Sequence, residues 1–326
     1  MPPCLGSIIA LQVTVLMKRA RAAGRFVAQW RGSKQGEENL MFDKISRSWS
    51  LAGQCWAVLK EDPELLVFPL FSSLAMIVLL ASFAWPVWTI YHGLDPVGTA
   101  GSTTHTARLM FYLVLGIFYV INYTVMFFFN TALIAVALRR LDGEPAGVGD
   151  GIQCALNNLS SIVAYAVIAA TIGGILRAIE ERVGLIGRIV VALVGAAWTL
   201  ASSLTLPVLA AESVGPIEAI SRSIELMRGT WGENIVGNGG ISAGVAVIAI
   251  PLVIVGFFVM SAAIATKQVG LIALAGLVFV VLVFGLGLVS TTLHSIYTAA
   301  LYRFATGDDH NAGIDRALLA EAYRLK

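Results

Sequence analysis

Six long runs of uncharged, mostly apolar residues dominate the chain. Each run has the length of a helix that crosses about 30 Å of hydrocarbon, which takes roughly 20 residues. Inside a bilayer every backbone polar group needs a partner within the protein, so runs of this length fold as helices. The sequence therefore predicts an all-α, polytopic membrane protein with six transmembrane helices. The runs cover about residues 65–91, 109–138, 159–176, 189–211, 235–266 and 269–301.

The overall composition supports this class of protein. Of the 326 residues, 57% are hydrophobic and only 13% are charged, whereas charged residues make up about 25% of an ordinary globular domain. The formal net charge of +2 gives no reason to expect nucleic acid as a partner. The predicted partner is the lipid bilayer.

The 22 Lys and Arg residues are divided unevenly between the two sides that six crossings define. Seventeen of them lie in the amino-terminal segment, the second-to-third and fourth-to-fifth connections and the carboxyl-terminal tail, and five lie on the other side. The side that is richer in Lys and Arg usually faces the cytoplasm. We therefore expect a multi-pass protein of the cell (plasma) membrane with both termini in the cytoplasm.

The stretch 212–234 is the one long polar interval between the apolar runs that keeps a helical pattern. Apolar residues recur at spacings of three and four, while Glu218 and Arg222 occupy the other side. This pattern predicts an amphipathic helix at the membrane surface, near residues 216–232. Glu212 precedes this helix. It is either a carboxylate of a functional site or a negative charge that interacts favourably with the helix dipole. The predicted apolar stripe consists of Ile217, Ile220, Ile224, Met227 and Trp231.

The same design occurs earlier in the chain. The sequence Ile-Ser-Arg-Ser starts at Ile45 and again at Ile220, and each copy ends in a tryptophan at the same spacing, Trp56 and Trp231. Each copy precedes a long apolar run, so the predicted internal repeat is a surface helix, the first near 42–60, plus a transmembrane hairpin. The motif either anchors these helices at the lipid surface or recognises a partner, and we favour anchoring.

The chain divides into three parts by composition. Residues 1–40 hold a short apolar run followed by basic residues, which is the reverse of a signal peptide. We expect this part to be a disordered extension, with Met41 as an alternative start. Residues 41–306 form the predicted six-span membrane domain, and residues 307–326 form a cytoplasmic tail.

Three motifs that are typical of metal, redox and nucleotide sites are absent from the sequence. It contains no HExxH, paired CxxC or P-loop pattern. We therefore predict no catalytic residues, no bound cofactor and no metal, and we favour a protein that is not an enzyme.

Polar residues inside the apolar runs form a candidate intramembrane polar site. Asn122 and Asn130 share a face of the second run, and His294 lies on a polar face of the sixth. Hydrocarbon penalises such groups unless they face protein or water. They either line a path for a small molecule or ion, or they form interhelical hydrogen bonds worth about 0.6 kcal/mol each.

Four stretches carry a resemblance to a known family: MFDKISRSW, EDPELLVFPL, PVLAAESVGPIEAISRSIELMRGTWGENIVGN and ALYRFATG. They resemble the multi-pass bacterial and archaeal membrane proteins of domain of unknown function 6159. That group is loosely similar to six-span proteins around the membrane domain of glycerophosphodiester phosphodiesterases. Because the family has no established activity, the resemblance implies architecture and membrane localisation only.

Two functions follow as competing predictions. The leading prediction is a non-enzymatic membrane protein that organises membrane components or senses the bilayer, with a membrane-protein partner or a second copy of the chain. The alternative is a transporter or channel for a small solute or lipid. A water-accessible cavity lined by Asn122, Asn130 and His294 favours transport, whereas a packed interior favours organisation.

Overall fold

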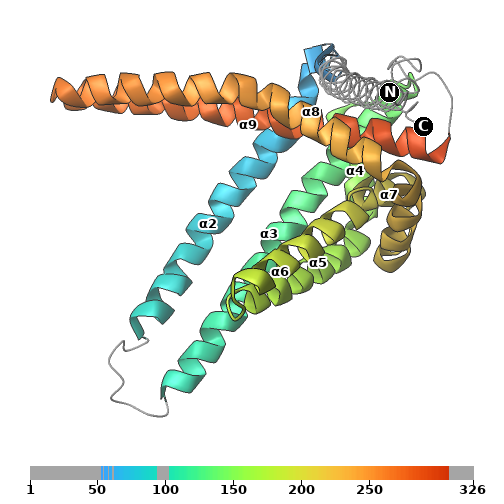
Figure 1. Ribbon diagram of the computed structural model, residues 1–326, viewed down its shortest axis with the longest axis horizontal. Helices are drawn as coiled ribbons and strands as arrows, with labels where there is room; N and C mark the ends of the chain where they lie inside the picture. Colours follow the sequence, from blue (N-terminus) through green and yellow to red (C-terminus); the bar gives the residue numbers. More distant parts are fainter. Residues whose placement is uncertain (1–52, 54, 58, 61, 94–102, 308–326) are drawn as a thin grey trace, which may run out of the picture. The chain divides into compact units, whose positions relative to one another are not determined.

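Helices make up all the regular structure of the described chain, as six membrane-length apolar runs require (Figure 1). The computed structural model describes residues 53, 55–57, 59–60, 62–93 and 103–307. These belong to one compact unit, Trp49–Lys326. The predicted extension 1–40 lies outside the described residues, as does the tail after Gly307. The predicted fold class, an all-α protein with six membrane-length helices, is confirmed.

After the helical residues 53, 55–57 and 59–60, a short 3-10 helix is followed by eight α-helices in the described residues. They are η1 Pro63–Leu66, α2 Val67–Gly93, α3 Thr103–Leu141, α4 Val148–Asn157, α5 Leu159–Glu180, α6 Leu185–Ala201, α7 Thr205–Glu212, α8 Pro216–Ala265 and α9 Val269–Thr306. The segments long and apolar enough to cross a membrane are Pro63–Thr89, Leu109–Leu141, Leu159–Glu180, Leu185–Glu212, Asn238–Ala265 and Val269–Thr306.

The fourth span consists of two helices rather than the single helix predicted. α6 ends at Ala201 and α7 begins at Thr205, with a turn between them. Ser203 favours an end to α6, because its hydroxyl donates a 2.9 Å hydrogen bond to the Leu200 carbonyl oxygen. Pro207 lies in the first turn of α7, where the missing backbone N–H removes no hydrogen bond within the helix.

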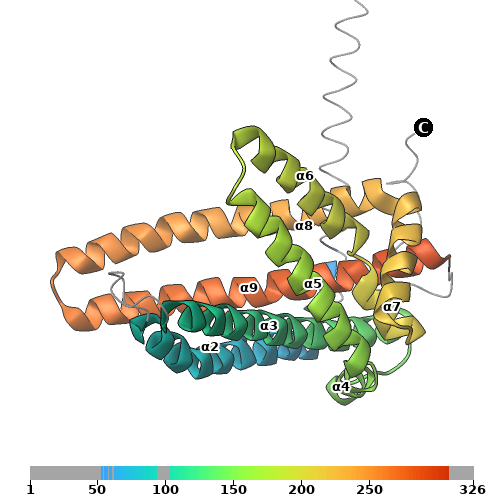
Figure 2. The same cartoon turned by 90° about the horizontal axis from the view of Figure 1, so that it is seen from below.

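The predicted surface helix and the fifth span form one continuous helix, α8. A helix of 50 residues is about 75 Å long, more than twice the thickness of the hydrocarbon. Only Asn238–Ala265 is apolar enough to span, so the polar beginning of α8 extends beyond the hydrocarbon. Figure 2 shows that α8 changes direction along its length. Residues 216–229 of α8 are called the surface segment below.

The buried side of the surface segment differs from the predicted apolar stripe. Ala219 and Ser223 are fully buried and Leu226 is 8% exposed, whereas Ile217 is 73% exposed. Met227, a member of that stripe, is buried. The small side chains of Ala219 and Ser223 allow the helix to approach its neighbours closely, and a pattern of large apolar residues does not reveal them.

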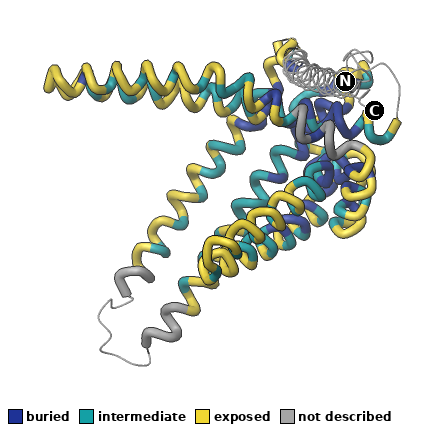
Figure 3. The backbone as a smooth tube through the Cα atoms, in the orientation of Figure 1, coloured by how far each residue is buried: buried dark blue, intermediate teal, exposed yellow. Residues whose placement is uncertain are grey.

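The buried core lies where the carboxyl-terminal half of α3 meets α4, α7 and the end of α9 (Figure 3). Gly151 allows α4 to cross α3 closely. A Cβ at this position would lie 2.5 Å from the Ala132 carbonyl oxygen and 2.7 Å from Cγ2 of Val136. No side chain fits there, so only glycine permits this contact.

α8 and α9 form a helical hairpin that exposes mostly apolar side chains. The two helices are joined by a short turn in which Lys267 has a left-handed backbone, with φ of 52°. Gly256 of α8 faces the ring of Phe279 in α9, and a Cβ there would lie 2.3 Å from that ring. Exposed apolar surface on both helices is what contact with lipid requires.

Candidate functional site

Asn122 and His294, two of the predicted intramembrane polar residues, take part in contacts between helices. The Asn122 amide donates to the Met76 sulfur at 3.2 Å and so joins α3 to α2. Nε2 of His294 lies 3.3 Å from Oγ of Ser242 and so joins α9 to α8. Both contacts match the interhelical alternative to a transport path.

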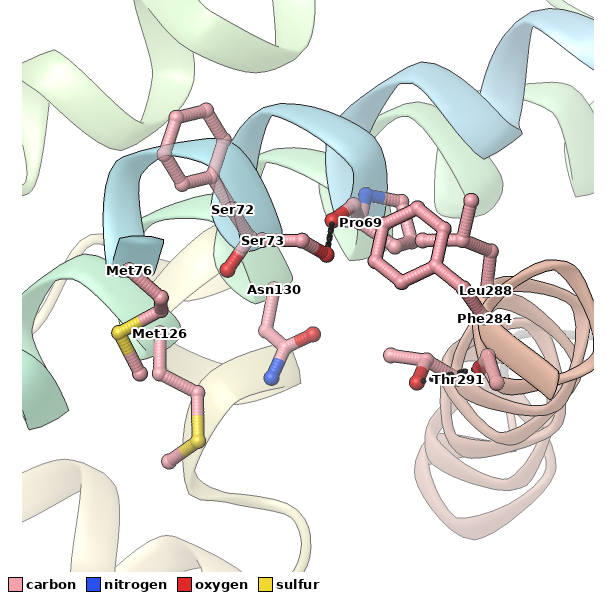
Figure 4. A pocket seen from close by; sticks show the side chains of 11 residues that line it. Pro69, Ser72, Ser73, Met76, Met126, Asn130, Phe284, Leu288 and Thr291 are labelled. Atoms are coloured by element: carbon pink, nitrogen blue, oxygen red, sulfur yellow. Dashed lines mark hydrogen bonds between the residues drawn. The ribbon is translucent and has the colours of Figure 1, made fainter. Parts of the chain in front are cut away.

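Asn130 lies in a different environment from the other two. It lines a cavity of about 350 Å³ between α2, α3 and α9 (Figure 4). The hydroxyls of Ser73 and Thr291 in the same cavity are bonded to carbonyl oxygens of their own helices. The Asn130 amide makes no hydrogen bond with the described residues. Only one of the three predicted residues therefore lines this cavity.

Ser223 of the surface segment closes the break in the fourth span. Its fully buried hydroxyl donates a 2.7 Å hydrogen bond to the Ala201 carbonyl oxygen and accepts a 3.1 Å bond from the Leu204 backbone N–H. These two backbone groups are freed where α6 ends and α7 begins. Asn234 adds a 2.7 Å bond to the hydroxyl of Ser203 in the same turn. The surface segment therefore completes the fourth span.

Arg222 joins the surface segment to the ends of two spans. Its Nε lies 3.6 Å from Oε1 of Glu212, at the end of α7, and its Nη1 lies 2.8 Å from Oε2 of Glu225. Oη of Tyr302 donates to the same Glu212 oxygen at 2.9 Å, which brings α9 into the cluster. The hydrogen bond with Glu225, together with the charges of Glu225 and Glu212, raises the pKa of Arg222 above its ordinary value, although desolvation opposes part of this change.

The remaining residues of the surface-helix motif contribute less to this cluster. Glu218 is exposed in the first turn of α8, where a negative charge interacts favourably with the helix dipole. Arg222 pairs with Glu212 and Glu225 rather than with Glu218, its neighbour at the four-residue spacing. Trp56 is 43% exposed, with Nζ of Lys60 5.9 Å from its ring centroid. The Trp231 side chain lies outside what the structure describes.

Glu212 and Arg222 border a larger charged pocket of about 570 Å³. Side chains from the ends of α3, α7 and α9, the turn after α3, α4 and the surface segment line this pocket. A second ion pair, between Arg303 and Asp142, joins α9 to the turn after α3. The lining residues are Ala135, Leu138, Arg139, Asp142, Glu144, Cys154, Ala210, Ala211, Glu212, Arg222, Tyr302, Arg303 and Thr306.

Among the polar residues of this pocket, only Glu212 and Arg222 were predicted from the sequence. Asp142, Tyr302 and Arg303 were not identified, because each follows an apolar run as ordinary charged and aromatic residues at a membrane interface do. One signal for them exists in the sequence. Polar residues end the second, fourth and sixth runs, and in a six-span protein these ends lie on the same side of the membrane.

A three-ligand cluster of His, Cys, Asp or Glu suited to a metal ion does not occur among the described residues. The free thiols described are Cys55 and Cys154. Burial raises the pKa of Cys55 to about 12. Burial also raises the pKa of Cys154, although the nearby charge of Arg139 opposes part of this change.

Six membrane-length helices and a charged pocket at the ends of three of them define a multi-pass α-helical membrane protein. Residues 109–313 match the family of unknown function DUF6159, and the chain belongs to that family. The match contains every residue that lines the charged pocket. No curated protein and no solved structure matches the chain. The looser similarity to glycerophosphodiester phosphodiesterases stays a prediction.

Proposed function

We propose that the chain is a non-enzymatic membrane protein that senses the bilayer, and organises other membrane components, through the surface segment. One observation carries this proposal. The segment is bonded to the ends of the spans on one side, while Ile217 and Ile224 are 73% and 36% exposed on another. Exposed apolar side chains beside a charged helix face are typical of segments that insert shallowly, about 5–10 Å deep, at the boundary of headgroups and acyl chains.

The contacts of the segment supply a route by which lipid affects the spans. The Ser223 hydroxyl forms hydrogen bonds with the backbone at the break in the fourth span. Arg222 and Tyr302, the latter from the sixth span, both contact the Glu212 carboxylate. A bilayer that holds Ile217 and Ile224 at a different depth therefore changes the preferred position of a helix that completes the fourth span. Packed cores respond to such shifts by changing between discrete arrangements rather than by gradual deformation.

Fluorescence in defined vesicles tests this proposal. A cysteine that carries an environment-sensitive fluorophore replaces Ile224, and in a matched chain it replaces Glu225, with the native cysteines substituted in both. We expect emission at position 224 to shift between loosely and tightly packed lipids while emission at position 225 stays constant. Equal responses at the two positions would contradict sensing by this segment.

We also propose that the protein lies in the cell membrane with both termini in the cytoplasm. The support is the division of the basic residues, seventeen on that side and five on the other. In this orientation the charged pocket and the surface segment both face the cytoplasm. A membrane-protein partner or a second copy of the chain then contacts the surface segment from that side.

The cavity beside Asn130 favours a second candidate function, a path for a small solute or lipid. An amide without a hydrogen-bond partner is costly in hydrocarbon, so this cavity takes up water or a polar ligand. Cysteine at position 130, exposed to a membrane-impermeant thiol reagent in sealed vesicles, tests the path. Labelling at position 130 but not at lipid-facing Val253 supports it, and protection at both positions would rule it out.

A further inference from the structure

The charged pocket lies at the level where the spans leave the hydrocarbon. Its walls come from the last turns of α3, α7 and α9, where the apolar runs end. Charged and aromatic side chains at such positions lie among lipid headgroups. The volume of about 570 Å³ falls within the range of about 300–1,000 Å³ usual for small-molecule sites.

The charges that line the pocket balance. Three arginines, Arg139, Arg222 and Arg303, face three carboxylates, Asp142, Glu144 and Glu212. A pocket for a simple anion carries an excess of positive charge, and one for a simple cation carries an excess of negative charge. Equal numbers of both suit a ligand that carries both charges.

Four of these six charges are already engaged within the protein. Arg222 pairs with Glu212, and Arg303 pairs with Asp142. The hydroxyl of Tyr302 further bonds Glu212. These contacts fix one wall of the pocket, because each partner comes from a different helix or turn.

Arg139 and Glu144 are the two charges that have no close partner among the described residues. The ion pair of Arg139 with Asp150 is long, at 3.9 Å, and both side chains are 51% exposed. Glu144 is exposed and makes no ion pair within the described chain. The Glu144 backbone N–H bonds the Arg139 carbonyl oxygen at 2.9 Å, so one turn holds both side chains at the pocket.

We propose that this pocket binds a zwitterion that carries a phosphate group and a primary ammonium group, the chemistry of a phosphoethanolamine headgroup. Arg139 binds the phosphate, since its planar guanidinium matches phosphate oxygens with two parallel hydrogen bonds. Glu144 accepts hydrogen bonds from the ammonium group, which has three N–H donors, whereas a quaternary ammonium has none. The proposal holds whether or not the surface segment senses the bilayer.

The apolar part of the pocket favours a lipid as the source of this group. Ala135, Leu138, Ala210 and Ala211 line the pocket beside the charges. Ala135 and Leu138 of the second span are buried, whereas Ala210 and Ala211 of the fourth span leave apolar surface next to the headgroup for acyl chains. A soluble phosphoethanolamine shares the headgroup but gains nothing from these residues.

Binding to the purified full-length chain in detergent tests the proposal. The probes are short-chain phosphatidylethanolamine, phosphatidylcholine and phosphatidylglycerol, together with soluble phosphoethanolamine. Each is titrated while the midpoint of thermal unfolding is measured, because a ligand that binds the native state raises that midpoint. The variants are Arg139→Gln and Glu144→Gln. Matched controls are Arg177→Gln and Glu181→Gln, which break an exposed ion pair of 3.5 Å outside the pocket.

The parent chain is expected to bind phosphatidylethanolamine about tenfold more tightly than phosphatidylcholine, the size of one charge-assisted hydrogen bond. Glu144→Gln is expected to remove this preference. Arg139→Gln is expected to weaken the binding of both lipids about tenfold, and the control variants are expected to change neither the preference nor the affinities. If phosphatidylethanolamine binds and soluble phosphoethanolamine does not, the pocket is a site for a lipid headgroup. If soluble phosphoethanolamine binds equally tightly, the ligand is a soluble molecule of the same chemistry. Phosphatidylglycerol bound as tightly as phosphatidylethanolamine, unchanged binding by both pocket variants, or no binding of any probe would overturn the proposal.

Discussion

Replacing Ser223 by alanine removes the side chain that completes the fourth span. The Ser223 hydroxyl is fully buried and makes hydrogen bonds of 2.7 Å to the Ala201 carbonyl oxygen and 3.1 Å from the Leu204 N–H. Leaving one buried polar group without a partner costs about 1–3 kcal/mol. Two backbone groups lose their partner here and part of the loss relaxes, so we expect the free energy of unfolding to fall by about 2–4 kcal/mol.

Unfolding in mixed micelles measures this change. The fraction of a denaturing detergent is increased and the loss of helix is followed by circular dichroism. Ser221→Ala is the matched control, because Ser221 belongs to the same Ile-Ser-Arg-Ser motif but is exposed. Exposed substitutions usually change stability by less than about 0.5 kcal/mol. A Ser223→Ala chain as stable as the Ser221→Ala chain would refute the role assigned to this hydroxyl.

Three other predictions follow from the contacts and charges described. Tyr302→Phe removes a hydrogen bond to a carboxylate and should lower the free energy of unfolding by about 1.5 kcal/mol, while Tyr112→Phe, at an exposed position, should leave it unchanged in the same assay. With the other cysteines substituted, Cys55 should resist alkylation in folded protein at pH 8 and react after unfolding. Its raised pKa, about 12, keeps the thiol protonated until the pH approaches that value, so rapid labelling of the folded chain at pH 8 would contradict its burial. Reporter fusions after Gly98 and after Gly149 should lie on the external and cytoplasmic sides respectively, and the same side for both would disprove the topology.

The spans were predictable from sequence because length and polarity alone determine whether a segment fits the hydrocarbon. The turn between the fifth and sixth spans illustrates this, since Lys267 and Gln268 interrupt an otherwise continuous apolar run and α9 begins at Val269. A membrane-length run between polar residues has few alternatives in a bilayer, so its helix can be predicted without knowledge of its neighbours.

The break in the fourth span was not predictable in the same way. Ser202 and Ser203 are common enough in membrane helices that they do not signal an end by themselves. The break is stabilised by Ser223, about twenty residues later, whose hydroxyl bonds both freed backbone groups. This contact depends on tertiary packing, and no local pattern encodes it. Packing of Ser223 also rotates the buried side of the surface segment away from the predicted stripe.

The candidate site was predictable only in part for a related reason. Asn122, Asn130 and His294 are unusual inside apolar runs, so the sequence identified them, but it did not reveal which would bond to another helix and which would line a cavity. The charged pocket combines Arg139, Arg303 and other residues from the ends of three spans. Each of these residue types is common at a membrane interface, so the sequence does not single them out. Only the tertiary structure shows that they line one pocket.

A spin-label scan of the surface segment tests most directly the claim that it lies at the lipid surface with one side bonded to the spans. Labels at single positions are compared for contact with oxygen, which concentrates in lipid, and with a water-soluble nickel complex. We expect lipid contact at Ile217 and Ile224, water contact at Ser221 and Glu225, and an immobile label shielded from both reagents at Leu226. A mobile label with the same exposure to water at all five positions would contradict this claim.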